Sequence, residues 1–463
     1  MRHNNYNTKY IFAISMVSAM GGLLFGYDWV VIGGAKPFYE VFFGIANSTA
    51  LQGWAMSCAL IGCLLGAIVS GVLSDRLGRK RLLLTAAILF ALSAVGTGAT
   101  HQFIMFVFCR IIGGVAIGLA SNLSPMYIAE VSPAFMRGRF VSLNQLTIVV
   151  GILAAQLVNW QVAEPVPIES TNAEILSSWN GQMAWRWMFW AELVPSSVFF
   201  ILLFFVPESP RWLATKGKEH QAKAILTKIG GQNYAQQEYA SIALGLNKER
   251  HNVNLKHLFN GRIKKVLVIG IVLATFQQWC GINVIFNYAQ EIFAAAGYGV
   301  SDILFNIVVT GSVNLVFTFI AIYTVDLLGR RWLMLIGAGG LAGIYLVMGV
   351  AYFYEITGWP FLLLVVSAIA CYAMSLAPVT WVVLSEIFPN KMRGAAMAVA
   401  TVSLWLASFL LTYTFPLLNS RLGAYGTFWL YGGICVAGWI FIFRRLPETK
   451  GKTLEEIERQ VFE

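Results

Sequence analysis

Charged residues are scarce in this chain of 463 residues, where Asp, Glu, Lys and Arg together make up 12%. Hydrophobic residues make up 58%, and the mean hydropathy is +0.68. A soluble protein of this length needs far more polar surface, so the composition excludes a water-soluble globular fold. Most of the chain is therefore expected to face lipid or other membrane helices.

Several patterns typical of enzymes are also missing. The sequence contains no glycine-rich phosphate loop, no paired metal ligands and no Ser/His/Asp arrangement. The five histidines lie outside the apolar runs or at their ends. The six cysteines all lie inside apolar runs without metal-ligand spacing, which predicts packed thiols and no disulfide framework. We expect no enzymatic activity, no catalytic residues, no cofactor and no metal.

Apolar runs long enough to cross a bilayer, each of about 20 residues, recur along the whole chain. Twelve are predicted, near 10–34, 51–74, 82–100, 102–125, 140–162, 185–206, 264–293, 302–325, 332–353, 359–385, 394–416 and 424–444. The predicted fold is an all-α integral membrane protein with two pseudo-symmetric six-helix bundles. The predicted domains are an N-terminal bundle at 1–209, a cytoplasmic helical linker at 210–262, a C-terminal bundle at 263–445 and a cytoplasmic tail at 446–463.

A charged signature occurs twice. Residues 75–81 (DRLGRKR) have an echo 251 residues later at 326–331 (DLLGRR). Two further motifs repeat in the same order: Glu130 before Arg137 with Glu386 before Arg393, and Glu208 with Glu448. Three pairs in register indicate two related halves, and internal duplication is typical of secondary transporters.

The net charge of +10 is distributed unevenly along the chain. If the N-terminus is cytoplasmic, 28 of the 32 Lys and Arg residues fall on the inner side. The exceptions are Lys36, Arg186 and Arg421 outside, and Arg110 within a span. This positive-inside pattern predicts that both termini are cytoplasmic, and it argues against a nucleic-acid partner.

The polar stretch 210–262 alternates charged and apolar residues at helical spacing, with a break at Lys216-Gly217-Lys218. Two interpretations stay open: a solvated linker, or a helical latch across the cytoplasmic ends of both bundles.

Three charged residues lie deep within predicted spans of the first half: Asp28, Arg110 and Glu192. Each ionised group costs roughly 2.5–3.5 kcal/mol near the centre of a spanning helix, so it needs a partner or a water-filled path. Asp28 and Arg110 are natural partners, because no other charged residue lies in the middle of the first four spans. The pair could be static and fix helix packing. Alternatively, the carboxylate could load and release a proton as its distance from the arginine changes.

Amide side chains gather in the seventh span around a glycine, at Gln277, Gln278, Gly281, Asn283 and Asn287, and two more occur at Gln145 and Asn314. Amides suit a polyol ligand, because each offers a donor and an acceptor to neighbouring hydroxyls. The glycine predicts a helix break that faces a cavity. Hydrogen bonds between helices are the alternative use of these amides. Trp381 follows a proline and could stack on a sugar ring, or simply pack.

The chain resembles the sugar porter family of the major facilitator superfamily, and within it the bacterial D-xylose–proton symporters, over nearly its whole length. The motifs responsible are Gly71 with residues 75–79, RIIGG at 110–114, PMYIAE at 125–130, PESPR at 207–211, QQ with GIN at 277–283, and PETKG at 447–451. The first is shared across the superfamily, whereas PESPR, the QQ and GIN pair and PETKG are specific to sugar porters.

The resemblance implies functional residues of three kinds. Sugar contacts are implied at Gln145, Gln277, Gln278, Asn283 and Trp381, with Asn314 and Phe25 nearby. Proton coupling is implied at Asp28 with Arg110 and Glu192. Cytoplasmic gate ion pairs, which would hold the outward-open state shut on its inner side, are implied at Asp75, Arg79, Glu130, Arg137, Glu208, Asp326, Arg330, Glu386, Arg393 and Glu448.

Passive relatives typically carry a neutral residue at the position of Asp28, so the carboxylate favours symport. The chain departs from the family pattern at Leu404, Ala377 and Asn287, where relatives usually have an amide, a glycine and an aromatic residue. These changes bear on which sugar fits, so pentose and hexose both stay open.

The sequence therefore predicts alternating-access symport of a monosaccharide with a proton across a bilayer. The alternatives are a passive uniporter of the same fold and a sugar-sensing receptor, and the short cytoplasmic tail argues against the receptor. The lack of targeting signals favours a bacterial inner membrane, and the sequence gives no indication of oligomeric state.

Overall fold

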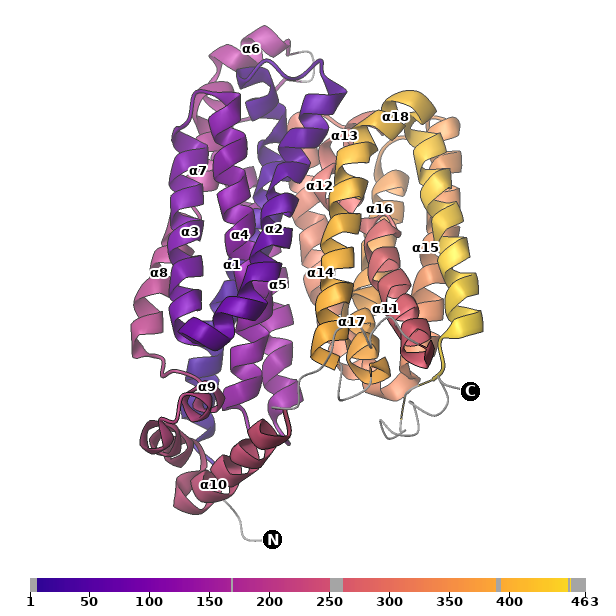
Figure 1. Ribbon diagram of the computed structural model, residues 1–463. Helices are drawn as coiled ribbons and strands as arrows, with labels where there is room; N and C mark the ends of the chain where they lie inside the picture. Colours follow the sequence, from indigo (N-terminus) through magenta and orange to yellow (C-terminus); the bar gives the residue numbers. More distant parts are fainter. Residues whose placement is uncertain (1–5, 168–169, 250–260, 389–392, 449, 451–463) are drawn as a thin grey trace.

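The computed structural model describes residues 6–167, 170–249, 261–388, 393–448 and 450. Every regular element among these residues is a helix. Figure 1 shows two bundles side by side, the first from the indigo-to-magenta part of the chain and the second from the salmon-to-yellow part. The first helix begins and the last helix ends at the same end of the molecule, which we call the terminal end.

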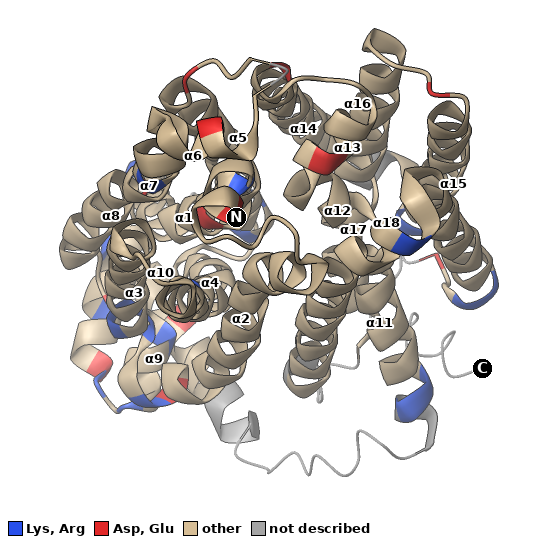
Figure 2. Cartoon of the chain, turned by 90° about the horizontal axis from the view of Figure 1, so that it is seen from above, with Lys and Arg blue, Asp and Glu red and all other residues tan. Residues whose placement is uncertain are grey.

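The first bundle has six spans, the last of which is divided into three short helices. Its elements are α1 (Thr8–Phe42), α2 (Thr49–Leu77), α3 (Arg79–Ala99), α4 (Phe103–Val131), α5 (Arg137–Val162), η1 (Asn180–Ala184), α7 (Trp185–Trp190) and α8 (Leu193–Phe205). A short helix, α6 (Asn172–Ser177), lies at the end opposite the terminal end. Seen from above, most of the helical surface carries no charged residue (Figure 2).

The second bundle repeats this plan. Its elements are α11 (Gly261–Trp279), α12 (Ile282–Asn287), α13 (Ala289–Ala295), α14 (Val300–Leu328), α15 (Arg330–Phe353), α16 (Trp359–Met374), α17 (Leu376–Ile387) and α18 (Arg393–Arg445). Among the described residues, 11 helices are long and apolar enough to cross a membrane. One of them, α18, bends at Gly423 and contains two spans. The predicted all-helical fold with twelve spans is therefore confirmed.

Two spans of the second bundle are broken in the middle. The seventh span is interrupted between α11 and α12 at Gly281, whose φ of +86° lies in the left-handed region. A side chain there would be strained, and its Cβ would press against the ring of Tyr431. The tenth span breaks at Ser375, between α16 and α17. Such breaks are tolerated in a membrane where the freed backbone is enclosed by protein or lines a cavity.

The first span is longer than the sequence predicted. The predicted span ends at residue 34 and leaves Lys36 outside the membrane, whereas α1 continues to Phe42 and buries both Lys36 and Glu40. The helix keeps these charges because Lys36 pairs with Glu40 one turn later, at 2.8 Å, and with Glu291 of α13 in the other bundle. The outer side predicted for Lys36 stays a prediction, whereas its burial within α1 follows from a partner in a distant part of the chain.

The polar stretch after α8 forms α9 (Pro210–Thr215) and α10 (Glu219–Glu249), separated at Gly217 and bent at Gly230–Gly231. The break predicted near Gly217 is present. Described contacts join these helices to the first bundle: Trp212 donates to the Asp75 carbonyl at 3.1 Å, and Asn7 donates to the Ile229 carbonyl at 2.9 Å. Residues 250–260 lie outside the described chain, so the latch across both bundles stays a prediction.

Contacts between the two bundles gather at the end opposite the terminal end. There the Val166 amide donates to the Ser301 hydroxyl at 3.0 Å, and the rings of Trp160 and Phe305 lie 5.8 Å apart. The ion pair between Lys36 and Glu291 joins α1 to α13 at the same end. The molecule is thus closed between its halves at this end.

Candidate functional site

Asp28 and Arg110 meet in the interior of the first bundle. Asp28 lies on α1 and Arg110 on α4, and both side chains are almost completely buried. One guanidinium nitrogen of Arg110 donates to the Asp28 carboxylate, and the other donates to the Asp28 backbone carbonyl at 3.1 Å. The second carboxylate oxygen of Asp28 receives no hydrogen bond from the described residues. Arg110 therefore balances the charge of Asp28 through one carboxylate oxygen, and the other oxygen can still accept a hydrogen bond.

Glu192 lies where the sixth span bends between α7 and α8. Its side chain is buried, and neither carboxylate oxygen receives a hydrogen bond from the described residues. It is close enough to interact electrostatically with both Asp28 and Arg110. Burying an ionised carboxylate without a donor is far more costly than burying the neutral acid. We therefore expect Glu192 to be protonated in this conformation, while Asp28 balances Arg110.

Three predicted sugar contacts form a chain of amides where the seventh span breaks. The Gln277 side chain donates to the Ala377 carbonyl at 3.4 Å, and that of Gln278 donates to the Gln277 side-chain oxygen at 3.2 Å. Asn283, just past the break, donates to the Gln278 side-chain oxygen. The break at Gly281 brings amides from two consecutive helices together. The hydroxyls of a bound polyol could replace the hydrogen bonds between these amides, because each amide offers both a donor and an acceptor.

The other predicted sugar residues come from both bundles. Gln145 on α5 and Trp381 on α17 are half-buried, and Asn314 on α14 is buried. Phe25 on α1 lies against Trp405 of α18, with ring centroids 6.0 Å apart. Within the described chain, no hydrogen bond joins Gln145, Asn314 or Trp381 to the amide chain. Their shared role in binding stays a prediction.

Sequence reasoning missed both Trp29 and Trp405 as candidate site residues. The Trp29 ring lies 5.9 Å from that of Phe25 and 5.9 Å from that of Trp405, so three aromatic rings meet between α1 and α18. A signal was available, because Trp29 follows Asp28 directly and lies one helical turn after Phe25. The partner on α18 carried no such signal.

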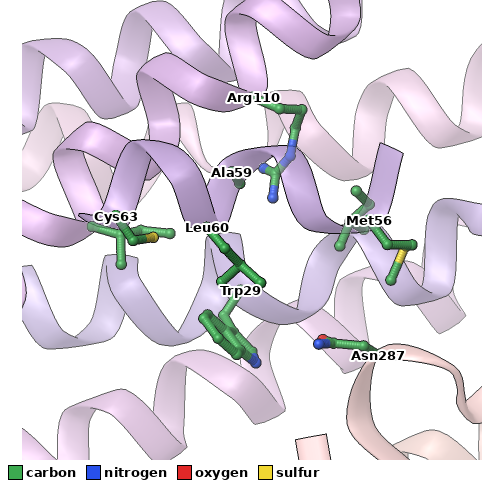
Figure 3. Close-up of a pocket in the computed structure, with 9 residues that line it drawn as sticks. Trp29, Met56, Ala59, Leu60, Cys63, Arg110 and Asn287 are labelled. Atoms are coloured by element: carbon green, nitrogen blue, oxygen red, sulfur yellow. The ribbon is translucent and has the colours of Figure 1, made fainter. Parts of the chain in front are cut away.

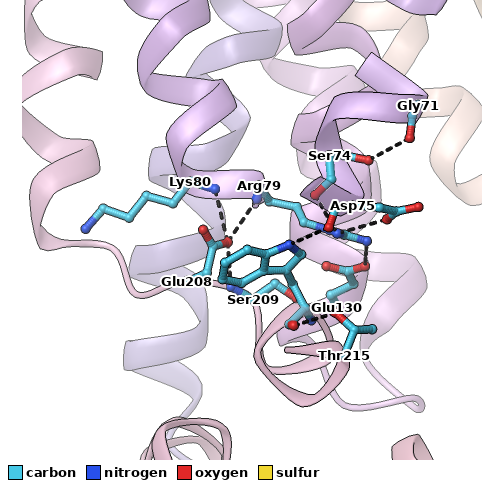
Figure 4. Close-up of polar contacts among 10 residues, drawn as sticks. Gly71, Ser74, Asp75, Arg79, Lys80, Glu130, Glu208, Ser209 and Thr215 are labelled. Atoms are coloured by element: carbon cyan, nitrogen blue, oxygen red, sulfur yellow. Dashed lines mark hydrogen bonds and ion pairs between the residues drawn. The ribbon is translucent and has the colours of Figure 1, made fainter. Parts of the chain in front are cut away.

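The first copy of the duplicated signature forms a compact polar cluster at the terminal end (Figure 4). Arg79 pairs with Glu130 of α4 at 2.9 Å and with Asp75 of α2 at 3.3 Å. Glu208, just after the sixth span, accepts from the backbone amides of Arg79 at 3.0 Å and Lys80 at 3.1 Å. A carboxylate at a helix N-terminus satisfies free amides and complements the helix dipole.

The second copy has the same construction. Arg330 pairs with Glu386 at 3.4 Å, and Glu448 accepts from the backbone amides of Arg330 at 3.0 Å and Arg331 at 3.2 Å. Each described pair lies within its own bundle, so in this conformation the clusters bind helices of one half together.

Three predicted gate residues are not part of these described pairs. Arg137 is exposed at the start of α5 and forms no ion pair with described residues. The side chains of Asp326 and Arg393 lie outside the described part of the structure. Their roles stay predictions, as does the role of all ten residues as a gate.

The turn before α3 allows a test of the contact between the Glu208 carboxylate and the first backbone amides of α3. Gly78 has φ +96° and ψ 162°, and a Cβ there would overlap the Glu208 carboxylate. We expect Gly78→Ala to lower the free energy of unfolding by about 1–3 kcal/mol, because it adds backbone strain to displacement of the carboxylate. Thermal unfolding in detergent would measure the change. Gly71→Ala is the matched control, since open space surrounds that helical position, and equal melting temperatures for the two variants would contradict this account.

Comparison with known proteins agrees with this architecture. A family model described as sugar (and other) transporter matches residues 14–461. The chain is 40% identical to the D-xylose-proton symporter of Escherichia coli, over 98% of this chain and 96% of that protein. It is 38% identical to the arabinose-proton symporter of Bacillus subtilis, with the same two coverages.

A solved structure agrees as well. The inward open conformation of the xylose transporter from E. coli superposes with a TM-score of 0.84 at 39% identity, covering 97% of this chain and 100% of that one. The chain is therefore a multi-pass membrane protein that belongs to the sugar transporter family, a family of transporters and not of enzymes.

Proposed function

We propose that this protein carries a monosaccharide across the membrane together with a proton, by alternating access between its two bundles. The observation that carries the proposal is a buried Asp28–Arg110 pair in the same interior as a chain of amides and a cluster of aromatic rings. Both kinds of group are needed: amides and rings for a polyol, and an ionisable carboxylate for the proton. The relatives described as D-xylose-proton and arabinose-proton symporters support this combination.

The charges suggest how the two substrates are coupled. Deprotonated Asp28 forms an ion pair with Arg110, and protonation of Asp28 would weaken that ion pair. The buried Glu192 lies nearby with no donor among the described residues, so it can hold a proton while Asp28 is paired with Arg110. In the proposed cycle, sugar and proton together favour closure on one side, and loss of the proton from Asp28 on the other side resets the pair.

The proposed orientation places the terminal end in the cytoplasm of a bacterial inner membrane. The positive-inside distribution of Lys and Arg supports this direction. With that orientation the present conformation is closed on the outside, in line with its similarity to the inward open xylose transporter.

Uptake into proteoliposomes tests the proposal. The purified protein would be given radiolabelled D-xylose, L-arabinose and D-glucose, with and without an inward proton gradient. A gradient of one pH unit should raise internal sugar to about tenfold above external for one proton per sugar, because each unit is worth about 1.36 kcal/mol.

A protonophore is the control and should abolish the accumulation. Equilibration to equal concentrations under every gradient would instead identify a passive uniporter. Absence of uptake for every sugar would contradict the proposed function altogether.

A further inference from the structure

Three charged groups meet where the two bundles touch at the end opposite the terminal end. Lys36 of α1 pairs with Glu40 of the same helix at 2.8 Å and with Glu291 of α13 in the other bundle. The side chains of Lys36 and Glu40 are 3% and 8% exposed, and that of Glu291 is 27% exposed. We call these three residues the interbundle charge cluster. The proposed transport of sugar and proton does not use them.

The charges of the interbundle charge cluster do not balance. One ammonium group faces two carboxylates, and in the described part of the chain no other cation pairs with either acid. One oxygen of Glu40 accepts from the Gln52 side chain at 3.3 Å, whereas the second oxygen of Glu291 is buried and receives no hydrogen bond from described residues. Two carboxylates that share one largely buried site ionise together only at a high free-energy cost. A single bound proton removes the excess charge.

The other titratable groups around the cluster supply no positive charge. Tyr39 of α1, Cys58 of α2 and Tyr288, between α12 and α13, face it, and their side chains are neutral at ordinary pH. The Tyr39 hydroxyl donates to the Met56 sulfur at 3.2 Å, and the Tyr288 hydroxyl donates to the Thr412 carbonyl of α18 at 2.6 Å. Neither hydroxyl is therefore free to donate to the acids, and the excess negative charge stays uncompensated.

The cluster borders a small cavity between the bundles. Met56, Cys63 and Asn287 are among the residues that line this cavity, and Figure 3 shows Met56 and Asn287 toward one side of it and Cys63 toward the other. Asn287 directly precedes Tyr288, whose ring centre lies 5.7 Å from the Lys36 Nζ. The cluster therefore lies on the side of Met56 and Asn287, between the cavity and the end opposite the terminal end.

Opening at this end would divide the cluster. Lys36 and Glu40 lie one turn apart on α1 and would stay together, whereas Glu291 would move away with the other bundle into water. A neutral ion pair and a hydrated carboxylate need no added proton. Closure returns Glu291 to the ion pair and buries the excess negative charge. Closure and proton binding are thus linked, and each favours the other.

We propose that Glu40 and Glu291 form a second proton-binding site, which takes up one proton when the bundles close at the end opposite the terminal end. The two carboxylates share this proton as a coupled pair. Because the site opens to the side from which it loads, its proton returns to that side and is not carried across the membrane. In the proposed orientation that side is the outside, so an acidic exterior favours closure. The inference goes beyond the proposed function, in which the transported proton binds at Asp28.

The pH dependence of cysteine labelling tests this site without any transport measurement. Ser301→Cys lies at the closed contact with Val166, so a membrane-impermeant maleimide should label it faster when that contact opens. Labelling in detergent would be compared with that of the same reporter in Glu291→Gln, where Lys36 faces a single carboxylate. The ratio of the two rates at each pH cancels the pH dependence of the thiol reaction itself. We expect this ratio to rise at least about tenfold from about pH 5 to about pH 8, because one linked proton changes a population up to tenfold per pH unit.

Three further variants carry the same reporter. Glu40→Gln also leaves one carboxylate for Lys36, so its rate relative to Glu291→Gln should stay constant with pH. Glu355→Gln is the matched control, because it makes the same chemical change at an exposed acid just after α15 and should keep the full rise. Asp28→Asn should keep the rise as well, since Asp28 is not part of the cluster.

The outcomes separate the two proposals. A ratio that stays flat between about pH 5 and about pH 8 would overturn the second proton-binding site, and so would a rise that survives Glu40→Gln or disappears in Asp28→Asn. Failure of the wild type to transport any monosaccharide would instead overturn the proposed function, because the labelling experiment contains no sugar.

Discussion

Asp28→Asn is expected to abolish sugar accumulation against a gradient while leaving sugar exchange intact. Asparagine imitates the protonated acid in shape and charge, but it can neither bind nor release a proton. Under a gradient of one pH unit the internal-to-external sugar ratio should fall from about 10 in the wild type to about 1 in the variant. Counterflow, in which labelled sugar enters vesicles preloaded with unlabelled sugar, should continue, because exchange needs no return of the empty carrier. Both quantities come from the same proteoliposomes.

Two further variants sharpen this experiment. Asp302→Asn makes the same chemical change at an exposed position at the start of α14 and should leave accumulation unchanged. Glu192 could ionise and pair with Arg110 once Asp28 is neutral, so Asp28→Asn with Glu192→Gln removes that substitute. Undiminished accumulation in the double variant would sink the assignment of the proton to Asp28 and leave it as a member of a structural ion pair.

Lys36→Met is expected to open the molecule at the end opposite the termini. Lys36 is 3% exposed in its side chain and holds two carboxylates, Glu40 on its own helix and Glu291 on the other bundle. Without the cation, the buried Glu40 and the half-buried Glu291 face each other, and breaking a buried pair costs about 3–5 kcal/mol. The closed conformation bears most of this cost, because opening exposes Glu291 to water.

Labelling of a reporter cysteine measures the opening. Ser301→Cys lies at the closed contact with Val166, and a membrane-impermeant maleimide should label it at least about tenfold faster in Lys36→Met, as each 1.4 kcal/mol shifts a population tenfold. The parent without Ser301→Cys gives the background from the six native cysteines.

The control breaks a pair of the same chemistry elsewhere. Lys223→Met removes the exposed partner of Glu219 on α10 and should not change the labelling rate. Exchanging the charges, with Lys36→Glu and Glu291→Lys, restores a cross-bundle pair and should return labelling toward the parent rate. A charge-swapped protein that labels as fast as Lys36→Met would show that the pair does not hold the contact.

Much of the fold could be predicted from sequence because each membrane span depends only on the residues within it. A run of about 20 apolar residues predicts a span without reference to the rest of the chain. The duplicated signature likewise predicted two halves, and the breaks at Gly281 and Gly217 follow from glycine in a polar or charged setting. The burial of Lys36 could not be predicted, for the opposite reason. Its burial depends on Glu291, a residue 255 positions away that α13 brings to it.

The site divides in the same way. Gln277, Gln278 and Asn283 are near in sequence, and a single break in the helix brings them together. Asp28 and Arg110 were paired by elimination, since an isolated charge in a span needs a partner. Trp29 could not be placed, because tryptophan is common in membrane helices and its contact with Trp405 depends on how two bundles meet.

The carboxylates of Glu208 and Glu448 have a mechanical consequence. Each lies just past the last span of its half and accepts hydrogen bonds from the first backbone amides of that half's third span, α3 or α15. Displacement of either helix end therefore pulls on the other, and strain spreads through the bundle instead of bending one helix. Each half is therefore expected to move as a rigid body. The positions that can bend are the interrupted spans beside the predicted sugar contacts. A sugar that straightens or bends those positions by a small amount would then tilt a whole bundle.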